Sequence, residues 1–453
     1  MDLNINIQKL GTTDNIFGFY KYLNDEREAN NHVLLESVSE DSHKMLFSFI
    51  GLNPDFMVKI SGEDLEFYNI KSDVGDKMKD ASQSIEYVGN EYEMPFKDEV
   101  PINMGGLDKL KEIFPISRTA LPELFPRKVF SGGLLGYIGY DVVAPYVGYK
   151  PSTSSRQLFP DAIMGLFTTV LAYSHSTNTV YQITNTVGDY SPNAEINDLF
   201  TNFKKNKNDG NLKSLKFNKQ ELLKQNSGFI TNTSLDEWIE MINSTKEHIL
   251  SGDIVQAVIS RKMKIEVDDV APMDVYEALR ILNPSPYMFF LNFHGVNNGN
   301  IHIIGSSPEA LITKNQSVLE TVPIAGTRRR GRNPDDEIRM ENELLNSEKE
   351  LAEHIMLVDL ARNDLARVSV PGTIDTYELI RLKKFPNIMH LISKIRSKSY
   401  LDPFKILKSM FPAGTVSGAP KKRAMQIIHE LETEDRGPYA GCVGYVSFAG
   451  DMD

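Results

Sequence analysis

The sequence is poor in the features that mark secreted, membrane-spanning and nucleic-acid-binding proteins. Its 453 residues include one cysteine, Cys442, so no disulfide can form within the chain and a reducing compartment is indicated. The longest apolar-leaning run, Ala162–Tyr173, is too short to span a bilayer, and the first six residues show no secretion signal. A net charge of −12 disfavours attraction to nucleic acid or membranes. These absences favour a cytoplasmic location and leave small-molecule chemistry open.

The composition itself is that of a globular protein, with 41% hydrophobic and 24% charged residues. Asparagine, lysine, serine and glycine dominate residues 206–232, which predicts a linker. We therefore expect an N-terminal region at 1–205 and a second domain at 233–453. Strands and helices mix without regular βαβ alternation, which predicts a mixed α/β or α+β fold with largely antiparallel sheets. Within the second domain, apolar spacing predicts a strand over 254–263 and one long helix over 339–365.

A glycine-containing loop, Phe411–Lys421, is the most distinctive segment of the chain. Gly414 and Gly418 can adopt backbone angles that other residues avoid, and Pro420 stands where a helix should begin. Backbone amides at a helix start suit a carboxylate or phosphate. The spacing is not that of a Walker A loop. Taken alone, the loop has a second interpretation as a surface turn that precedes a helix.

Two carboxylates are spaced to share one face of the predicted long helix. Glu350 and Glu353 lie three residues apart, and His354 lies four residues after Glu350. Paired oxygen ligands suit Mg²⁺, whereas zinc is disfavoured because there is no cluster of cysteine and histidine. The same pattern is common on solvated helices, so the spacing alone leaves both interpretations open.

Four segments follow one another along the second half of the chain: Glu320–Arg328, Glu350–His354, Asp359–Asp364 and Phe411–Lys421. In this order they resemble the chorismate-binding enzymes, in particular the large subunits of anthranilate synthase. The resemblance is densest from Ser234 onward and implies a chorismate-binding-enzyme fold, a largely antiparallel β-sandwich core with helices packed outside.

The resemblance assigns roles to residues whose patterns alone are ambiguous. It implies that Glu350 and Glu353 serve a magnesium site. It also places His390 beside the hydroxyl that leaves the substrate ring, as general acid or hydrogen-bond donor. Without the resemblance, His390 would be interpreted as a core histidine. The residues implied to contact chorismate are Gly326, Thr327, Thr415 and Tyr439, of which Tyr439 could equally be a packed strand residue.

Two positions distinguish the reactions of this family. Relatives that add water to chorismate place a lysine where this chain has Gln256, and a neutral amide cannot act as that base. Aminodeoxychorismate synthases typically carry a nucleophilic lysine where this chain has Ala325. Gln256 is similar to the pattern in enzymes that add ammonia, and together the two positions favour an anthranilate synthase. No cysteine suited to glutamine hydrolysis is evident, so the resemblance implies a separate glutamine amidotransferase subunit as partner.

A regulatory site is also implied by the resemblance, in which tryptophan acts as a feedback inhibitor. In this pocket Glu36 would meet the ammonium group of tryptophan and Ser37 would hydrogen-bond the ligand. The apolar wall would consist of Pro286, Tyr287 and Met288, with Val443 and Tyr445 from the last strand.

The resemblance breaks off at the C-terminus. Relatives continue past the position of Asp453 into segments that carry a further pair of metal-binding glutamates, so we expect the sequence to be part of a longer protein. The run Arg328–Arg332 is expected to be a solvated loop, because no aromatic residues accompany it.

The expected function is that of a magnesium-dependent lyase of tryptophan biosynthesis, converting chorismate and ammonia to anthranilate and pyruvate. The alternatives are the chorismate-using component of aminodeoxychorismate synthase, which Ala325 disfavours, and a catalytically silent tryptophan-binding protein. Nucleic-acid binding is a more distant third.

Overall fold

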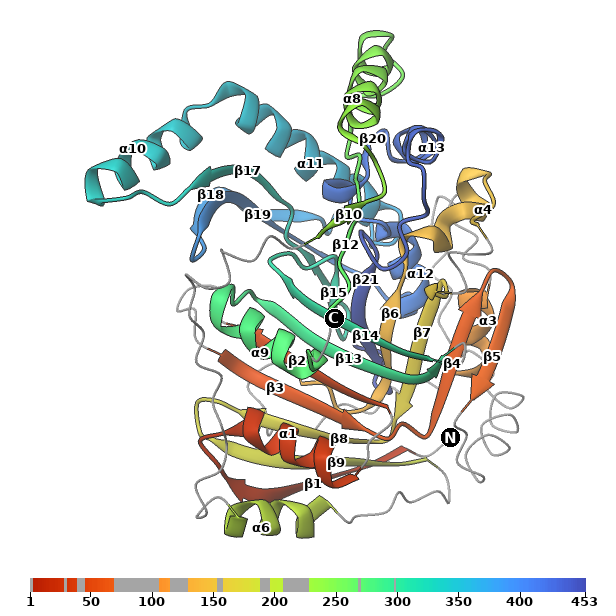
Figure 1. Ribbon diagram of the computed structural model, residues 1–453, viewed down its shortest axis with the longest axis vertical. Coiled ribbons are helices and arrows are strands. Elements are labelled where there is room, and N and C mark those ends of the chain that lie inside the picture. The colour runs from red at the N-terminus through yellow and green to blue at the C-terminus, as the bar shows by residue number, and fades with distance from the viewer. Residues whose placement is uncertain are drawn as a thin grey trace.

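Short apolar strands from both halves of the chain form a seven-stranded antiparallel sheet in a computed structural model of the protein (Figure 1). The structure describes residues 3–27, 31–38, 45–68, 106–114, 129–152, 158–187, 196–206, 228–267, 270–296 and 299–453. The strands, in order across this first sheet, are β1 (Leu3–Thr12), β9 (Thr179–Val187), β8 (Thr169–Ser174), β3 (Met45–Leu52), β2 (His32–Val38), β13 (Tyr287–Val296) and β14 (Gly299–Ser307).

The first sheet joins the two predicted regions of the chain. Strand β13 pairs directly with β2, with Tyr287 opposite Ser37. Because neighbouring strands share hydrogen bonds, the N-terminal region and the second domain form one continuous sheet across the predicted division. Most of the predicted linker, 207–227, lies outside the described residues.

A second antiparallel sheet packs against the inner face of the first. Leu291 of the first sheet meets Tyr137 and Tyr445 of the second in one buried cluster. This packing confirms the predicted fold, in which a largely antiparallel β-sandwich forms the core. The strands of the second sheet, in order, are β21 (Cys442–Ser447), β6 (Gly133–Ile138), β7 (Ala162–Phe167), β4 (Phe56–Ser61) and β5 (Asp64–Tyr68).

A third sheet and one of two short ladders carry several residues of the predicted active site, and the others lie on a helix and in loops. The third sheet contains β15 (Thr313–Asn315), β16 (Val318–Thr321), β19 (Ile388–Lys398) and β17 (Ile324–Arg329), with β18 (Asp375–Lys384) also paired to β19. The ladders join β10 (Ile230–Thr231) to β12 (Met263–Lys264), and β11 (Gln256–Ala257) to β20 (Gly418–Ala419). The strand predicted over 254–263 is therefore two separate short strands.

Helices cover the outer faces of these sheets (Figure 1). One group buries its apolar faces on the outer side of the first sheet, and a second group packs behind the second and third sheets. The first group is α1 (Ile16–Arg27), α6 (Ile196–Asn206) and α9 (Pro272–Leu282). The second is α3 (Gly106–Ile113), α10 (Pro334–Leu345), α11 (Glu348–Ala366), α12 (Pro403–Met410) and α13 (Lys421–Leu431). Further helical segments are η1 (Tyr140–Val143), α4 (Ala144–Val147), α8 (Leu235–Leu250) and η3 (Gly414–Val416).

The prediction of a single helix over 339–365 is wrong, because two helices, α10 and α11, occupy this range and the helical structure is interrupted between them. Asn346 ends α10 and Ser347 caps the start of α11, with the Ser347 hydroxyl accepting a hydrogen bond from the Glu350 amide. Asparagine and serine favour caps over helix interiors because their side chains compete for backbone hydrogen bonds. The break places Glu350 in the first turn of α11. Among the described residues, no helix is long and apolar enough to cross a membrane.

Candidate active site

The two predicted metal-binding carboxylates project from the first turns of α11 toward different partners. The Nη1 of Arg328 on β17 donates to Oε1 of Glu350 at 2.9 Å. The Nε2 of Gln256 on β11 donates to Oε1 of Glu353, also at 2.9 Å. Side chains from two distant strands therefore meet one helix face.

Gly326 brings β17 close to this helix face. The pairing of β17 with β19 slips by one residue between Ala325 and Thr327, and Gly326 has φ 71° at that bulge. A Cβ atom at Gly326 would lie 3.2 Å from Leu344 and 3.4 Å from Oε2 of Glu350. The left-handed backbone and the close approach both favour glycine, which positions its backbone beside the Glu350 carboxylate.

His390 lies opposite Thr327 on the neighbouring strand β19. Its Nδ1 is 2.9 Å from the Gly326 carbonyl oxygen and 3.0 Å from the Thr327 hydroxyl. A carbonyl can only accept, so Nδ1 carries the proton and Nε2 of the neutral ring is an acceptor. Burial lowers the pKa of His390, and the hydrogen bond to Gly326 opposes this shift. The neutral ring then keeps a lone pair on Nε2, and the predicted role of His390 as general acid or hydrogen-bond donor beside the leaving hydroxyl stays a prediction.

The glycine loop pairs with the strand that carries Gln256. Gly418 and Ala419 form a ladder with Ala257 and Gln256. Gly418 has φ 140°, and a Cβ there would lie 2.2 Å from the Gln256 carbonyl oxygen, so a side chain would break the ladder. At the other end of the loop, Gly414 packs against Leu360 of α11. The loop is thus held between β11 and the helix that carries the two glutamates.

Thr415 in this loop contacts a carboxylate that the sequence analysis missed. Its hydroxyl lies 3.0 and 2.9 Å from the two carboxyl oxygens of Glu309, a residue that follows β14. Burial raises the pKa of Glu309 to about 7, although hydrogen bonds from Thr415 and the Ile324 amide oppose the shift. Glu309 follows Ser-Ser-Pro and belongs to no periodic pattern or motif, so its place in the candidate site could not be predicted from the sequence and is evident only in the fold.

Glu309 and Thr415 also line a cavity beneath the loop. Asp364 of α11 lies in the same lining, where the buried Lys421 ammonium donates to its Oδ2 at 2.7 Å and to the Met410 carbonyl at 3.1 Å. Burial lowers the pKa of Lys421 and raises that of Asp364. The residues that line the cavity are Glu309, Leu311, Thr321, Pro323, Leu357, Leu360, Ala361, Asp364, Met410, Ala413, Gly414 and Thr415.

Tyr439 is connected to the loop from its other side. Its ring is 51% exposed and lies 5.6 Å from the guanidinium of Arg436, which donates to the Val416 carbonyl. The structure therefore groups Gln256, Gly326, Thr327, Glu350, Glu353 and His390 directly, and connects Thr415 and Tyr439 to them through the loop.

The residues predicted to form the tryptophan pocket lie on two opposite faces of the first sheet, because successive side chains of a strand alternate between its faces. Ser37 and Tyr287 lie on the face of the first sheet that meets Val443 and Tyr445. The neighbouring positions Glu36 and Met288 point to the opposite face, toward α9. Pro286 lies just before β13, where its carbonyl accepts from the Val38 amide.

The prediction that Glu36 meets a ligand ammonium is therefore not supported by its surroundings. Both carboxyl oxygens of Glu36 accept from Arg280, at 2.6 and 3.1 Å. Hydroxyls of Tyr276 and Ser48 add hydrogen bonds at 2.9 and 3.0 Å. An arginine of the protein already compensates the buried charge.

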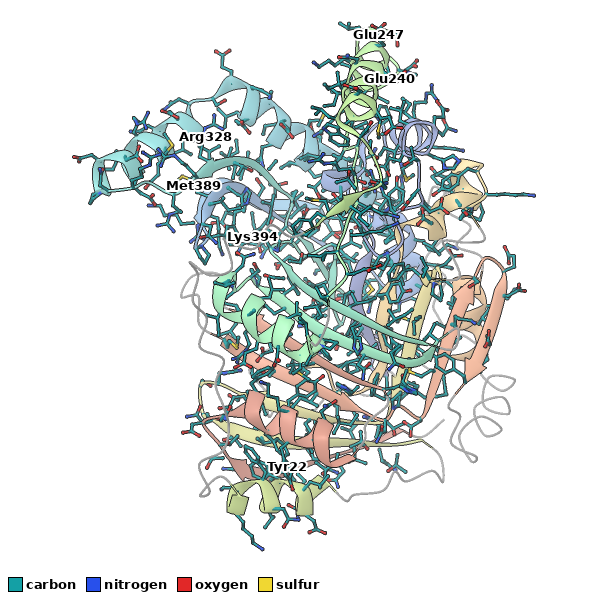
Figure 2. The ribbon with its side chains drawn as sticks, viewed as in Figure 1. Tyr22, Glu240, Glu247, Arg328, Met389 and Lys394 are labelled. Carbon is teal, nitrogen blue, oxygen red and sulfur yellow. The ribbon has the colours of Figure 1, made fainter. Side chains whose placement is uncertain are left out.

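The predicted solvated loop at Arg328–Arg332 begins within a strand, because Arg328 and Arg329 end β17, whereas Arg329 and Arg332 are exposed. Besides Arg328 with Glu350, Arg329 pairs with Asp336 and Arg330 with Glu337, both at 2.7 Å. The acidic first turn of α10 therefore supplies the carboxylates that pair with two of these arginines. Arg328 lies opposite Met389 on β19, at the end of the third sheet near α10 (Figure 2).

The donor set fits magnesium better than a softer metal. Among the described residues, no three histidine, cysteine, aspartate or glutamate side chains gather to hold a metal ion. Glu350 and Glu353 nevertheless supply two hard oxygen donors from adjacent turns, and Mg²⁺ commonly takes one or two protein carboxylates with water or substrate oxygens completing its shell.

Comparison with known proteins identifies the family of the chain. The profile of the chorismate binding enzyme family matches residues 79–453. The chain therefore belongs to the chorismate-binding enzymes.

Its relatives within that family carry a more specific name. Anthranilate synthase component 1 of Acetivibrio thermocellus is 37% identical over 436 residues, which cover 94% of this chain and 81% of the relative. The protein of that name from Aquifex aeolicus is 38% identical over 357 residues, covering 77% and 69%. The crystal structure of anthranilate synthase component I from Streptococcus pneumoniae superposes with a TM-score of 0.67 at 29% identity, covering 90% of this chain and 82% of that one.

The buried pair beneath the loop gives a stability prediction. Lys421→Met leaves Asp364 buried without its cation, so we expect the free energy of unfolding to fall by about 3–5 kcal/mol. The double variant Lys421→Met with Asp364→Asn should lose less, because no uncompensated charge remains. Denaturant unfolding followed by circular dichroism measures both. Lys422→Met, on the exposed side of the same turn, is the control, and a Lys421→Met loss no larger than that of the control would contradict the prediction.

Proposed function

We propose that the protein is the chorismate-using subunit of anthranilate synthase, a lyase that converts chorismate and ammonia to anthranilate and pyruvate. The observation that carries the proposal is the hydrogen bond from Gln256 to Glu353. A neutral amide stands beside the carboxylate pair, at the position where water-adding relatives place a basic lysine. Ala325 offers no amine that could attack the ring. External ammonia is therefore the nucleophile that these residues support best.

The remaining residues divide the proton transfers between them. When bound by Glu350 and Glu353, Mg²⁺ would stabilise negative charge on the substrate. Glu309, with a pKa raised to about 7, donates its proton to the departing ring hydroxyl, which leaves as water. His390 accepts the proton that the nitrogen sheds after it bonds to the ring, because its Nε2 carries the lone pair. The ring then loses the proton at the carbon that bears nitrogen as the C–O bond to the enolpyruvyl group breaks, which makes the ring aromatic, and protonation of the released enolpyruvate on carbon gives pyruvate.

The ammonia is proposed to come from a partner subunit. The relatives are named as a component 1, which implies a second component. We infer that this partner is a glutamine amidotransferase that supplies ammonia by hydrolysing glutamine. The purified chain should then use ammonium salts alone, and glutamine only after the partner is added.

Product identification tests the proposal directly. The protein is incubated with chorismate, ammonium and Mg²⁺, and the products are separated by chromatography. Anthranilate with pyruvate is expected. Aminodeoxychorismate would instead establish the alternative component that Ala325 disfavours. Tryptophan binding without any turnover would favour a silent binding protein and overturn the catalytic assignment.

Removing one carboxylate from the predicted metal site tests the magnesium role. We expect Glu353→Gln to abolish Mg²⁺-dependent turnover, because the amide loses the charged oxygen ligand and its acceptor for Gln256. Steady-state rates over a magnesium titration measure the effect. Glu348→Gln, on the exposed first turn of the same helix, is the matched control. Unchanged turnover in Glu353→Gln would remove this residue from the metal site.

The raised pKa of Glu309 gives a pH prediction. The carboxyl keeps its proton below about pH 7 and loses it above, so kcat should fall as pH rises through about 7. Glu309→Gln should lower kcat by about 100-fold and remove this alkaline limb. The stability contribution has the same sign, since burial disfavours the charged form: it is present below the ordinary pKa of 4.5 and lost as pH rises to about 7. An unaltered pH–rate profile in Glu309→Gln would exclude the acid role.

Tryptophan inhibition is the remaining part of the proposal. Ser37 lies on the face of the first sheet that turns toward the second sheet, and its hydroxyl lies 3.3 Å from the Phe47 amide. We expect Ser37→Ala to raise the tryptophan concentration that halves activity, because a polar contact to the ligand is lost. Inhibition curves measure this, with Ser61→Ala on β4 as control. Identical curves for Ser37→Ala and the unaltered protein would remove Ser37 from the pocket.

A further inference from the structure

One buried arginine joins the segments that form the candidate active site. Arg436 lies in the turn between α13 and β21 and is 3% exposed. Its Nη1 donates to the Val416 carbonyl at 2.8 Å, and its Nη2 donates to the Val258 carbonyl at 2.5 Å. Val416 follows Thr415 in the glycine loop, and Val258 lies two residues after Gln256 on the neighbouring strand.

The charge of Arg436 is compensated within the same cluster. Nε and Nη2 donate to the two carboxyl oxygens of Glu432 at 2.9 and 2.6 Å. Glu432 in turn accepts from the amide and hydroxyl of Ser260, at 2.7 and 3.0 Å. Four of the five guanidinium hydrogens are therefore committed, in a fork that a lysine ammonium cannot reproduce.

Two aromatic rings enclose the guanidinium. Its central carbon lies 4.6 Å from the ring centre of Tyr140 and 5.6 Å from that of Tyr439. Tyr140 belongs to the N-terminal region, whereas Tyr439 is one of the predicted chorismate contacts. The cation thus fixes the position of Tyr439 relative to the loop.

The N-terminal region also holds the backbone of this turn. The Asp141 carboxylate accepts from the Gly437 amide at 2.6 Å and from the Arg436 amide at 3.3 Å. Tyr149 donates to the same carboxylate at 3.2 Å. Arg436 is therefore anchored from behind, while its side chain extends toward the loop.

We propose that Arg436 is a positioning residue for chorismate binding. By holding the Val416 and Val258 carbonyls and stacking on Tyr439, it fixes Thr415, Gln256 and Tyr439 in one arrangement. It touches no reacting atom itself. The inference rests on the proposed function for its kinetic consequence, although the ordering of the loop follows from the contacts alone.

Hydrogen exchange tests the ordering without substrate. In Arg436→Ala, amides of the peptide 411–420 should exchange at least ten-fold faster than in the unaltered protein, and added methylguanidinium should reverse most of this change by filling the vacated space. Arg423→Ala, which removes a partly exposed arginine of α13, is the control and should leave the peptide unchanged. Equal exchange in Arg436→Ala and the unaltered protein would overturn the proposal.

Kinetics then test the role in binding. Arg436→Ala should raise KM for chorismate about 100-fold with a much smaller change in kcat, and methylguanidinium should restore at least a tenth of the lost kcat/KM. Arg436→Lys keeps the charge but lacks the fork of hydrogen-bond donors, so its kinetics should resemble those of Arg436→Ala. If Arg436→Ala does not fold, Arg436→Lys is measured in its place. Parallel losses in kcat and thermal stability without rescue would reduce Arg436 to a structural residue. If the unaltered protein itself shows no activity, the proposed function is refuted. The hydrogen-exchange result then decides whether Arg436 orders the loop.

Discussion

The close backbone approach at Gly418 is the constraint on which the candidate site depends. A side chain there would lie 2.2 Å from the Gln256 carbonyl oxygen, so only glycine allows the loop to pair with β11. That two-residue ladder sets the Gln256 amide against Glu353 and keeps the loop above α11. It also directs Thr415 to Glu309 on the other side of the loop. A separation of a few ångströms would break each of these contacts, because hydrogen bonds weaken sharply with distance.

Charge in this site is distributed so that each carboxyl group has a different environment. Glu350 meets Arg328 and Glu353 meets a neutral amide, which leaves the two acids on one helix face with unequal compensation. Within the described part of the chain, no cation is among the hydrogen-bond partners of Glu309, and burial raises its pKa, which suits its proposed role as a proton donor. Environment, more than residue type, separates a metal-binding role from an acid role.

The segments predicted to form the regulatory pocket are connected through shared sheets to those of the candidate active site. Because β13 pairs with β2, the segment around Tyr287 is attached to the N-terminal strands, and β21 is attached to β6 in the same way. Asp141 and Tyr140 extend this connection to the turn that carries Arg436. A ligand bound between the large sheets would therefore share continuous hydrogen-bonded structure with the glycine loop. Rigid shared elements of this kind are what allow two sites to influence one another.

Local sequence patterns predicted several caps and turns and indicated many residues of the candidate site. Caps and turns such as Ser234, the glycine loop and the spacing of Glu350 and Glu353 follow from backbone preferences that act over a few residues. Family resemblance added Gln256 and His390. Neither the local patterns nor the resemblance identified Glu309 as a candidate site residue or predicted that a new helix begins after Ser347. Neither predicted that Glu36 and Ser37 face opposite sides of the first sheet. These features depend on which strands lie side by side and on what is buried, and only the tertiary structure decides that, because burial and strand register are set by residues far apart in the chain.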